Sequence, residues 1–239
     1  RLGGRCAGDA VSERDLLDIV DAAFASVIAD GALRFVDDVA HLPPVADGAT
    51  RVTTVDMVVE GRDFDLSRSS PSSVGHRLVV QNLSDLASAG ATPVGFVWSL
   101  ALPTSFAVDL DAMRLLMQGA ADAARAGGMP LFGGDLSSTT GPLMASLTAF
   151  GDVCGPPLRR DTAAPGDVLY VSRALGASGA GLRHLLDDNR DHLCVHTHEF
   201  PTAETTLGVA LVGVATSCMD ISDSFAKDLH RLCRASGVG

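Results

Sequence analysis

The sequence predicts an α+β protein in which helices pack on a sheet of mixed or antiparallel strands. Segments with helical spacing of apolar residues alternate with β-branched runs, but the intervals are too irregular for repeated βαβ units. Apolar residues make up 46% of the 239 residues and aromatic residues only 5%, which indicates a core of Ala, Val and Leu. No apolar run reaches the roughly 18 residues of a membrane span, and the segment 1–9 lacks the apolar stretch of a signal peptide.

The first part of the chain begins with a predicted helix over 12–29. Ser12 stands at its N-cap position, and the carboxylate of Asp15 can bond back to the cap. A second helix over 75–89 has apolar residues at helical spacing and ends at Gly90. Further elements are expected as strands at 51–60, 94–102, 131–132 and 143–153 and as a helix at 109–126.

The run Cys154-Gly155-Pro156-Pro157 predicts a domain boundary. It divides the chain into an N-terminal domain, 1–154, and a C-terminal domain, 155–239. The elements expected in the second domain are a strand at 168–172 and helices at 178–188, 203–217 and 222–236. With one strong strand, this second α/β domain is expected to be incomplete.

The charge balance excludes one class of partner. With 18 basic and 29 acidic residues the net charge is −11, whereas nucleic-acid binding needs a basic surface. Small anions remain possible ligands, because metal ions can bridge two negative partners. The only lysine, Lys227, follows no Gly-rich loop, which excludes a Walker A or protein-kinase lysine. Five cysteines without a CxxC pair predict reduced thiols in a cytoplasmic protein.

Five short segments place an Asp where a buried element meets a turn or a helix. Asp56 interrupts a β-branched strand, for example, and Asp85 follows Asn82 by one helical turn. The acidic residues of these segments are Asp37, Asp38, Asp56, Asp85, Asp135, Asp220 and Asp223. Each one alone is explained equally well by a helix cap or a turn. Together they predict a site for several Mg²⁺ ions, which take oxygen ligands and keep coordination positions for phosphates.

The ordered segments VDD, TTVDMVVEG, NLSDLASAGA, FGGD, RRDTAAPGDVLYVS and DISD resemble those of thiamine-monophosphate kinases. That family belongs to the AIR-synthase-like ATP-binding superfamily, and the resemblance extends from about residue 12 to 239. It implies a two-domain AIR-synthase-like architecture, with helices on one face of the N-terminal sheet. It also implies a homodimer formed by the N-terminal domains, with ATP bound near the interface. The implied reaction transfers the γ-phosphate of ATP to thiamine monophosphate, giving thiamine diphosphate and ADP.

The resemblance also implies roles for single residues. By position in the motifs, the implied magnesium ligands are Asp38, Thr54, Asp56, Asp85, Asp135, Asp220 and Asp223, and the nucleotide contacts are Gly134, Asp135, Arg160 and Ser222. The acceptor is an ionised phosphate, so catalysis needs no general base and consists of aligning two anions. Several Mg²⁺ ions and the forked guanidinium of Arg160 would cancel their repulsion.

Several positions depart from the family pattern, mostly on the substrate side. Asp63 stands where the family has a substrate-contacting His, and Val55 where it has a metal-ligating Thr. Val36, Leu136 and Ser224 differ as well, and the later acidic and aromatic thiamine contacts have no counterpart in this sequence. Two alternatives therefore stay open. One is a superfamily enzyme that uses ATP on another small acceptor, and the other is a non-catalytic nucleotide-binding paralogue.

A separate group of metal-binding residue types is spaced by two, at His192, Cys194, His196 and His198. On a strand all four would face one side, and His and Cys suit zinc. The surrounding segment is polar, however, and the spacing fits none of the usual zinc patterns. A solvated loop is the favoured interpretation.

Overall fold

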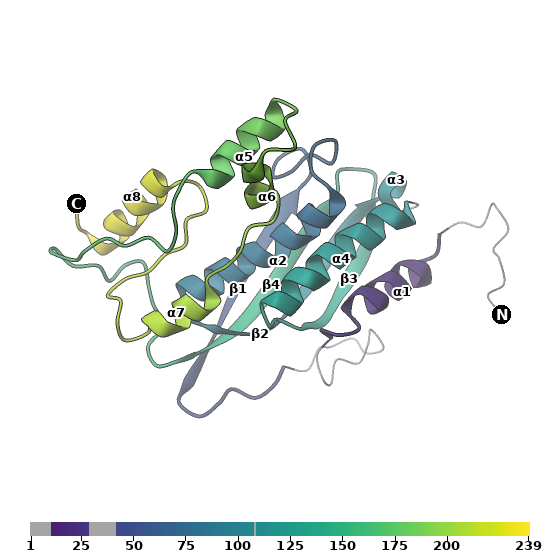
Figure 1. Ribbon diagram of the computed structural model, residues 1–239. Helices are drawn as coiled ribbons and strands as arrows, with labels where there is room; N and C mark the ends of the chain where they lie inside the picture. Colours follow the sequence, from purple (N-terminus) through teal and green to yellow (C-terminus); the bar gives the residue numbers. More distant parts are fainter. Residues whose placement is uncertain (1–10, 29–41, 108) are drawn as a thin grey trace.

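The computed structural model describes residues 11–28, 42–107 and 109–239, and Figure 1 shows the arrangement of its elements. The strands are β1 (Ala49–Val59), β2 (Thr92–Pro103), β3 (Leu131–Thr139) and β4 (Met144–Cys154). The helices are α1 (Glu13–Phe24), α2 (Pro71–Ser88), α3 (Thr104–Ala107), α4 (Leu110–Ala126), α5 (Ala177–Leu186), α6 (Leu193–Glu199), α7 (Thr205–Leu211) and α8 (Phe225–Ser236). The predicted α+β class is confirmed.

The strands form one mixed sheet in the order β1-β4-β2-β3. β4 pairs antiparallel with both β1 and β2, whereas β3 runs parallel to β2. A parallel pair needs a crossover connection, and α4 lies in the connection between β2 and β3. β1 and β3 therefore occupy opposite edges of the sheet, which separates the motifs that these two strands carry.

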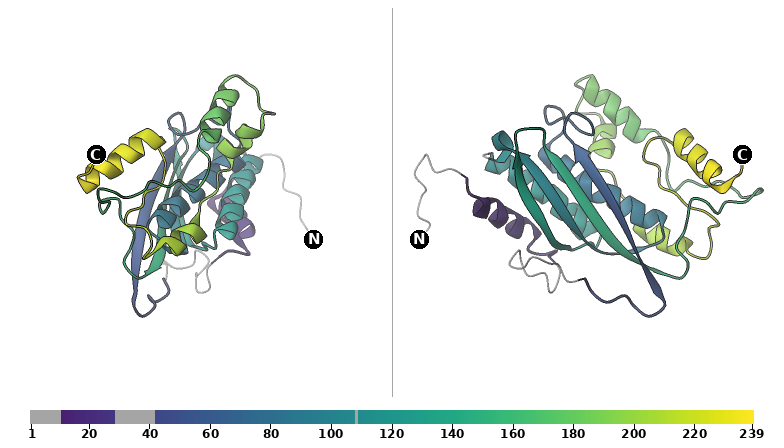
Figure 2. Two further views of the ribbon diagram at one scale, coloured as in Figure 1. Left: turned by 60° about the vertical axis from the view of Figure 1, so that its left-hand side comes forward. Right: turned by 180° about the vertical axis from the view of Figure 1, so that it is seen from behind.

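Helices α2 and α4 cover one face of the sheet, and α1 lies beside α4 (Figure 1). The view from behind in Figure 2 shows the strands in front of these helices. The core lies between the layers and includes Leu78, Leu116, Phe96 and Leu147, all at most 1% exposed. Burying a side chain of this size stabilises the fold by about 1.5–3 kcal/mol. None of the helices within the described ranges is long and apolar enough to cross a membrane.

Two glycines allow α2 and α4 to pack with their backbones in contact. A Cβ atom on Gly75 would lie 2.0 Å from the carbonyl oxygen of Leu116, and one on Gly119 would lie 2.0 Å from that of Ser72. Any larger residue would push the helices apart. Because α2 also contacts β1 and β4, this close packing fixes the position of α2 over that edge of the sheet.

Side chains alternate between the two faces of the sheet along β1. Thr54 and Asp56 point to the face that α2 covers and are partly buried. Val55 and Met57 point to the other face and are 62% and 59% exposed. Val55 therefore lies on the side of the sheet away from Asp56, and the hydroxyl on the covered face is that of Thr54.

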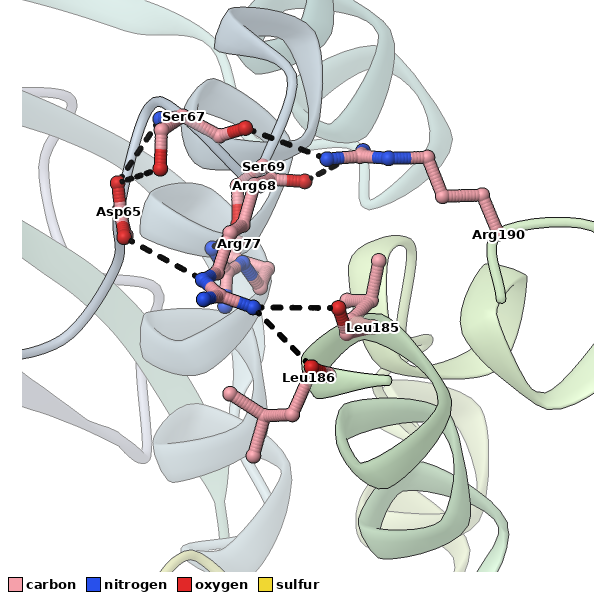
Figure 3. Close-up of polar contacts among 8 residues, drawn as sticks. All are labelled: Asp65, Ser67, Arg68, Ser69, Arg77, Leu185, Leu186 and Arg190. Atoms are coloured by element: carbon pink, nitrogen blue, oxygen red, sulfur yellow. Dashed lines mark hydrogen bonds and ion pairs between the residues drawn. The ribbon is translucent and has the colours of Figure 1, made fainter. Parts of the chain in front are cut away.

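Two arginines join α5 and the segment that follows it to the loop before α2, as Figure 3 shows. Arg68 donates to the carbonyl oxygens of Leu185 and Leu186, both at 3.4 Å. Arg190 in turn donates to the carbonyl oxygens of Arg68 (2.6 Å) and Ser67 (3.3 Å). Carbonyls at a helix C-terminus lack intrahelical partners, so a guanidinium there satisfies them and complements the helix dipole.

Some predicted boundaries are wrong. The expected strand over 168–172 is absent, and Val168 and Tyr170 are 72% and 84% exposed, because no strand in the described part of the chain lies beside this segment to pair with it. β3 continues to Thr139 instead of ending at 132. The helix expected over 203–217 is the shorter α7, which stops before Gly213 at a φ of 77°. The domain boundary after 154 stays a prediction.

Candidate functional site

The site begins where β1 and α2 meet. Thr54 on β1 and Asp85 near the end of α2 face each other because α2 packs over this edge of the sheet. The hydroxyl of Thr54 donates a hydrogen bond to Oδ2 of Asp85 across 2.5 Å. Asp56 lies two residues further along β1 and therefore on the same face. One strand and one helix thus bring together three of the predicted metal ligands.

Asp220 joins this group from the segment between α7 and α8. Its Oδ2 accepts a hydrogen bond of 3.4 Å from the hydroxyl of Ser84, the neighbour of Asp85 on α2. The charge of Asp220 raises the pKa of Asp56, and the charge of Asp85 raises the pKa of both Asp56 and Asp220. Residues about 160 positions apart in the sequence are therefore neighbours here, as the set of acidic segments predicted.

Two carboxylates of this group, Asp56 and Asp220, have raised pKa values. Burial, followed by the charges of Asp85 and Asp220, raises the pKa of Asp56 from 3.8 to about 6. Burial also raises the pKa of Asp220, with the charges of Asp85 and Asp228 adding to it. Arg160 and the Ser84 hydroxyl only partly oppose this pKa rise. Carboxylates held together in this way favour a bound cation, which would remove their mutual repulsion.

The donor set fits Mg²⁺ shared with a phosphate ligand. Across residues 11–28, 42–107 and 109–239, no three His, Cys, Asp or Glu side chains are close enough to enclose an ion on their own. Asp56, Asp85 and Asp220 are instead linked by the interaction of their charges, and their side chains offer only oxygen atoms. Mg²⁺ usually binds one or two carboxylates and completes its coordination with waters and substrate phosphates. The side chains are therefore suited to a bridging ion rather than a closed protein cage.

A cavity of about 360 Å³ is lined in part by Ser88, Arg160 and Met219, the residue before Asp220. Arg160 is exposed there, and its charge opposes the raised pKa of Asp220. A predicted nucleotide contact therefore lines an open space next to the carboxylates. A larger cavity of about 590 Å³ lies between α1 and α4, where Ile19 and Gln118 line it, and it contains none of the predicted site residues.

The loop that carries Ser222 and Asp223 leads into α8. Asp223 forms an ion pair of 2.5 Å with Arg231, so its carboxylate has a partner within the protein. Asp228 accepts the backbone N–H groups of this loop. Burial would raise the pKa of Asp228, but these N–H groups and Arg231 outweigh burial, and the pKa is lowered.

The FGGD motif lies away from the other carboxylates. β3 is the opposite edge strand from β1, with β4 and β2 between them. Asp135 pairs with Ser99 on the neighbouring strand and is exposed. Trp98, the residue before Ser99, is buried and points to the opposite face of the sheet. A Cβ on Gly134 would lie 2.3 Å from the ring of Trp98, so this glycine makes room for a core side chain. Within one chain Asp135 therefore lies at the opposite edge of the sheet from Asp56, and its role as a metal ligand stays a prediction.

Asp38 and Asp63 were also predicted to belong to the site. Asp38, with Val36 and Asp37, lies outside the described residues. Asp63 is exposed in the turn after β1, where its Oδ2 accepts a hydrogen bond of 2.8 Å from the backbone N–H of Val59.

Sequence reasoning missed three residues that shape the site. Ser84 was recognisable as the residue next to Asp85 in the NLSD motif. Asp228 and Arg231 are three apart on a helix, a spacing that predicts an ion pair. That spacing gives no sign that Asp228 is buried and bonded to the loop before its own helix.

The His and Cys residues after α5 lie on a helix rather than in the expected loop. Consecutive residues at a spacing of two differ by about 200° around a helix, so they do not share a side. His192 caps α6 by accepting the backbone N–H of Cys194 at 3.2 Å. His198 is 3.1 Å from the hydroxyl of Ser178. The described residues of this region hold no cluster suited to a metal ion.

Comparison with known proteins agrees with this fold. Residues 36–153 match the family described as AIR synthase related protein, N-terminal domain. A thiamine-monophosphate kinase of Corynebacterium glutamicum is 34% identical over 211 residues, which cover 84% of this chain and 63% of that protein. The crystal structure of thiamine-monophosphate kinase from Stenotrophomonas maltophilia K279a is similar with a TM-score of 0.79 at 30% identity, covering 95% of this chain and 73% of that one.

A solved complex of AaThiL with AMPPCP and TMP has a TM-score of 0.74 at 25% identity, covering 99% of this chain and 74% of that one. The chain spans 55–65% of the length of the curated relatives that it matches. The mixed sheet, its single helical layer and the carboxylates beside α2 define a protein of the AIR-synthase-related class. Within that class, the chain belongs to the thiamine-monophosphate kinase family.

Proposed function

We propose that this protein is an ATP-dependent kinase that phosphorylates thiamine monophosphate, giving thiamine diphosphate and ADP. The observation that carries the proposal is the group formed by Asp56, Asp85 and Asp220, with Thr54 bonded to Asp85. Such a group is suited to Mg²⁺ that bridges to phosphates. The names of the relatives, and the AaThiL complex with AMPPCP and TMP, support these substrates.

The reaction requires positioning more than acid–base chemistry. The acceptor phosphate is ionised near neutral pH, so no side chain has to remove a proton from it. Asp56, Asp85 and Asp220 would hold Mg²⁺, which would supply positive charge that offsets the repulsion between the two phosphate groups. Arg160 would donate to phosphate oxygens through its fork of N–H groups. Further metal or nucleotide contacts, proposed on the resemblance, are Asp38, Gly134, Asp135, Ser222 and Asp223.

Incubation of the full chain with ATP, Mg²⁺ and thiamine monophosphate tests the proposal. We expect equal amounts of thiamine diphosphate and ADP, followed by chromatography or ³¹P NMR, and no product when EDTA removes the metal. In the same assay, Asp135→Asn and Asp85→Asn compare how much the two sides of the sheet contribute to product formation. Magnesium-dependent ATP binding without any thiamine diphosphate would overturn the choice of acceptor.

Asp63 favours a second candidate, phosphate transfer from ATP to a different small acceptor. Its carboxylate accepts a hydrogen bond within the turn after β1. Its charge also partly opposes the lowering of the pKa of Arg77 that burial causes. The resemblance places a substrate-contacting His at this position, so an Asp used in the turn changes the acceptor side of the site. ADP release that requires another phosphate compound, and not thiamine monophosphate, would select this candidate. ATP binding with no acceptor-dependent ADP release would instead indicate a non-catalytic paralogue.

We also propose that two copies pair through the uncovered face of the sheet. Val55 and Met57 expose 62% and 59% of their surface on this face, as expected for an apolar surface that is buried in an assembly. Asp135 lies on the same face and would then lie within the interface. Light scattering after size-exclusion chromatography should give a dimer for the wild type and a monomer for Met57→Asp. Leu115→Asp on α4, 51% exposed, is the matched control, and a monomeric wild type would contradict the pairing.

We infer a cytoplasmic location for this activity. The described cysteines, Cys154, Cys194, Cys218 and Cys233, are free thiols, which is usual in a reducing compartment. Fractionation of the producing cells tests the location, and activity confined to an extracellular or membrane fraction would contradict it.

A further inference from the structure

Asp228 on α8 is a carboxylate that is only 2% exposed. Its Oδ2 accepts three consecutive backbone N–H bonds, from Ser222 (3.0 Å), Asp223 (2.9 Å) and Ser224 (3.1 Å). Its Oδ1 accepts a bond of 2.8 Å from Arg231. A buried carboxylate is unfavourable without such donors. Here all four donors come from α8 or from the loop immediately before it, so the carboxylate fixes that loop to its own helix.

We propose that Asp228 is a positioning residue for the phosphate site, because its hydrogen bonds set the path of the loop that carries Ser222 and Asp223. Both of its oxygens already have protein partners, so Asp228 acts through the loop and does not itself contact a ligand. The inference rests on the proposed function, in which this loop contacts metal and nucleotide. It adds a residue that none of the motif positions above includes.

Arg231 extends the same arrangement to the Asp223 side chain. Its Nη2 pairs with Oδ2 of Asp223 at 2.5 Å while its Nη1 bonds Asp228. One planar guanidinium therefore holds a loop carboxylate and the positioning carboxylate at once. Lysine carries a single ammonium group and lacks this fork geometry. The backbone of the loop is thus held by Asp228 directly, and the Asp223 side chain is held through Arg231.

Hydrogen exchange of the full chain, combined with titration of AMPPCP in the presence of Mg²⁺, tests the assignment. Asp228→Asn puts an NH₂ group, which cannot accept a hydrogen bond, in place of one oxygen. We expect amides at 222–224 to exchange about tenfold faster and the affinity for AMPPCP to fall about tenfold. Amides of β4 should keep their protection. The matched control is Asp109→Asn, since Asp109 caps α4 by accepting the backbone N–H of Ala112 at 3.0 Å and should change neither measurement.

Two results would overturn the positioning role. One is unchanged exchange at 222–224 in Asp228→Ala, which leaves no acceptor oxygen for the three N–H groups, and the other is faster exchange with unchanged affinity for AMPPCP. If neither Asp228 variant folds, Arg231→Lys provides the same two measurements in a milder form. Failure of the wild type to bind AMPPCP with Mg²⁺ would contradict the proposed function instead, and the exchange of 222–224 would still decide whether Asp228 fixes the loop.

Discussion

Thr54 on β1 donates its hydroxyl hydrogen to a carboxylate oxygen of Asp85 on α2, across 2.5 Å. The bond joins two motifs that lie 31 residues apart and ties the edge of the sheet to the helix that covers it. Asp56 and Asp220 lie near the same carboxylate, as the effect of its charge on both of them shows. The position of Asp85 thus depends on β1 as well as on its own helix.

Replacing Thr54 with Val removes this bond and keeps the shape of the side chain. Because a hydrogen bond to a charged group contributes about 1.5–3 kcal/mol, we expect affinity for magnesium-bound AMPPCP to fall about tenfold or more. Calorimetric titration measures the change. Thr53→Val is the control. Thr53 is exposed on the uncovered face of the sheet, and its hydroxyl donates to the carbonyl oxygen of Ala149. Equal losses in the two variants would show that the bond to Asp85 is not responsible.

The raised pKa of Asp56 predicts a stability change with pH in metal-free protein. In the folded state this pKa is about 6, against 3.8 without the protein environment. Between these values the folded protein keeps a proton that the unfolded chain has released, so stability falls as pH rises through this window. Above about pH 6 Asp56 is ionised in both the folded and the unfolded protein, so its destabilising contribution no longer changes with pH. Asp56→Asn removes this contribution and should melt at a higher temperature than the wild type at pH 7.

Thermal unfolding in EDTA at several pH values measures this difference. The gap between Asp56→Asn and the wild type should be small near pH 4 and widest above pH 6. Asp111→Asn, whose side chain is 91% exposed in the first turn of α4, should follow the wild type. A gap that does not change with pH would mean that Asp56 is not the group responsible.

The contact between α2 and α4 predicts a large cost for one added methyl group. Gly75→Ala would place its Cβ 2.0 Å from a backbone oxygen, so the helices must separate. We expect a loss of about 1–3 kcal/mol or more in the free energy of unfolding. Gly179→Ala on α5, where a Cβ meets nothing within 4 Å, should be neutral or stabilising by up to about 1 kcal/mol. Denaturant unfolding compares the two, and equal effects would refute the close packing.

Local sequence patterns predicted the elements that surround the site. The apolar spacing of α2 and α4 and the β-branched run of β1 are local signals that survive in the fold. The segment 168–172 has the same kind of β-branched run but lacks a partner strand in the described chain, and no local signal reports on a partner. Pairing between distant segments therefore limits what the sequence alone can predict.

The same limit applies at the site. The motifs predicted that Asp56, Asp85 and Asp220 belong together, and side-chain contacts and charges now link them. They gave no strand order, so the position of Asp135 across the sheet could not be deduced from the sequence. Asp228 has the sequence signature of an ordinary surface ion pair, and only its three backbone partners distinguish it.

Titration of the full chain with AMPPCP, with and without Mg²⁺, for the wild type and Asp85→Asn, tests the central claim most directly. We expect the wild type to bind the nucleotide only when Mg²⁺ is present. Asp85→Asn should lose this binding while its circular dichroism and melting temperature stay close to those of the wild type. Magnesium-independent binding by the wild type, or equal affinity in Asp85→Asn, would contradict a phosphate site built on Asp56, Asp85 and Asp220.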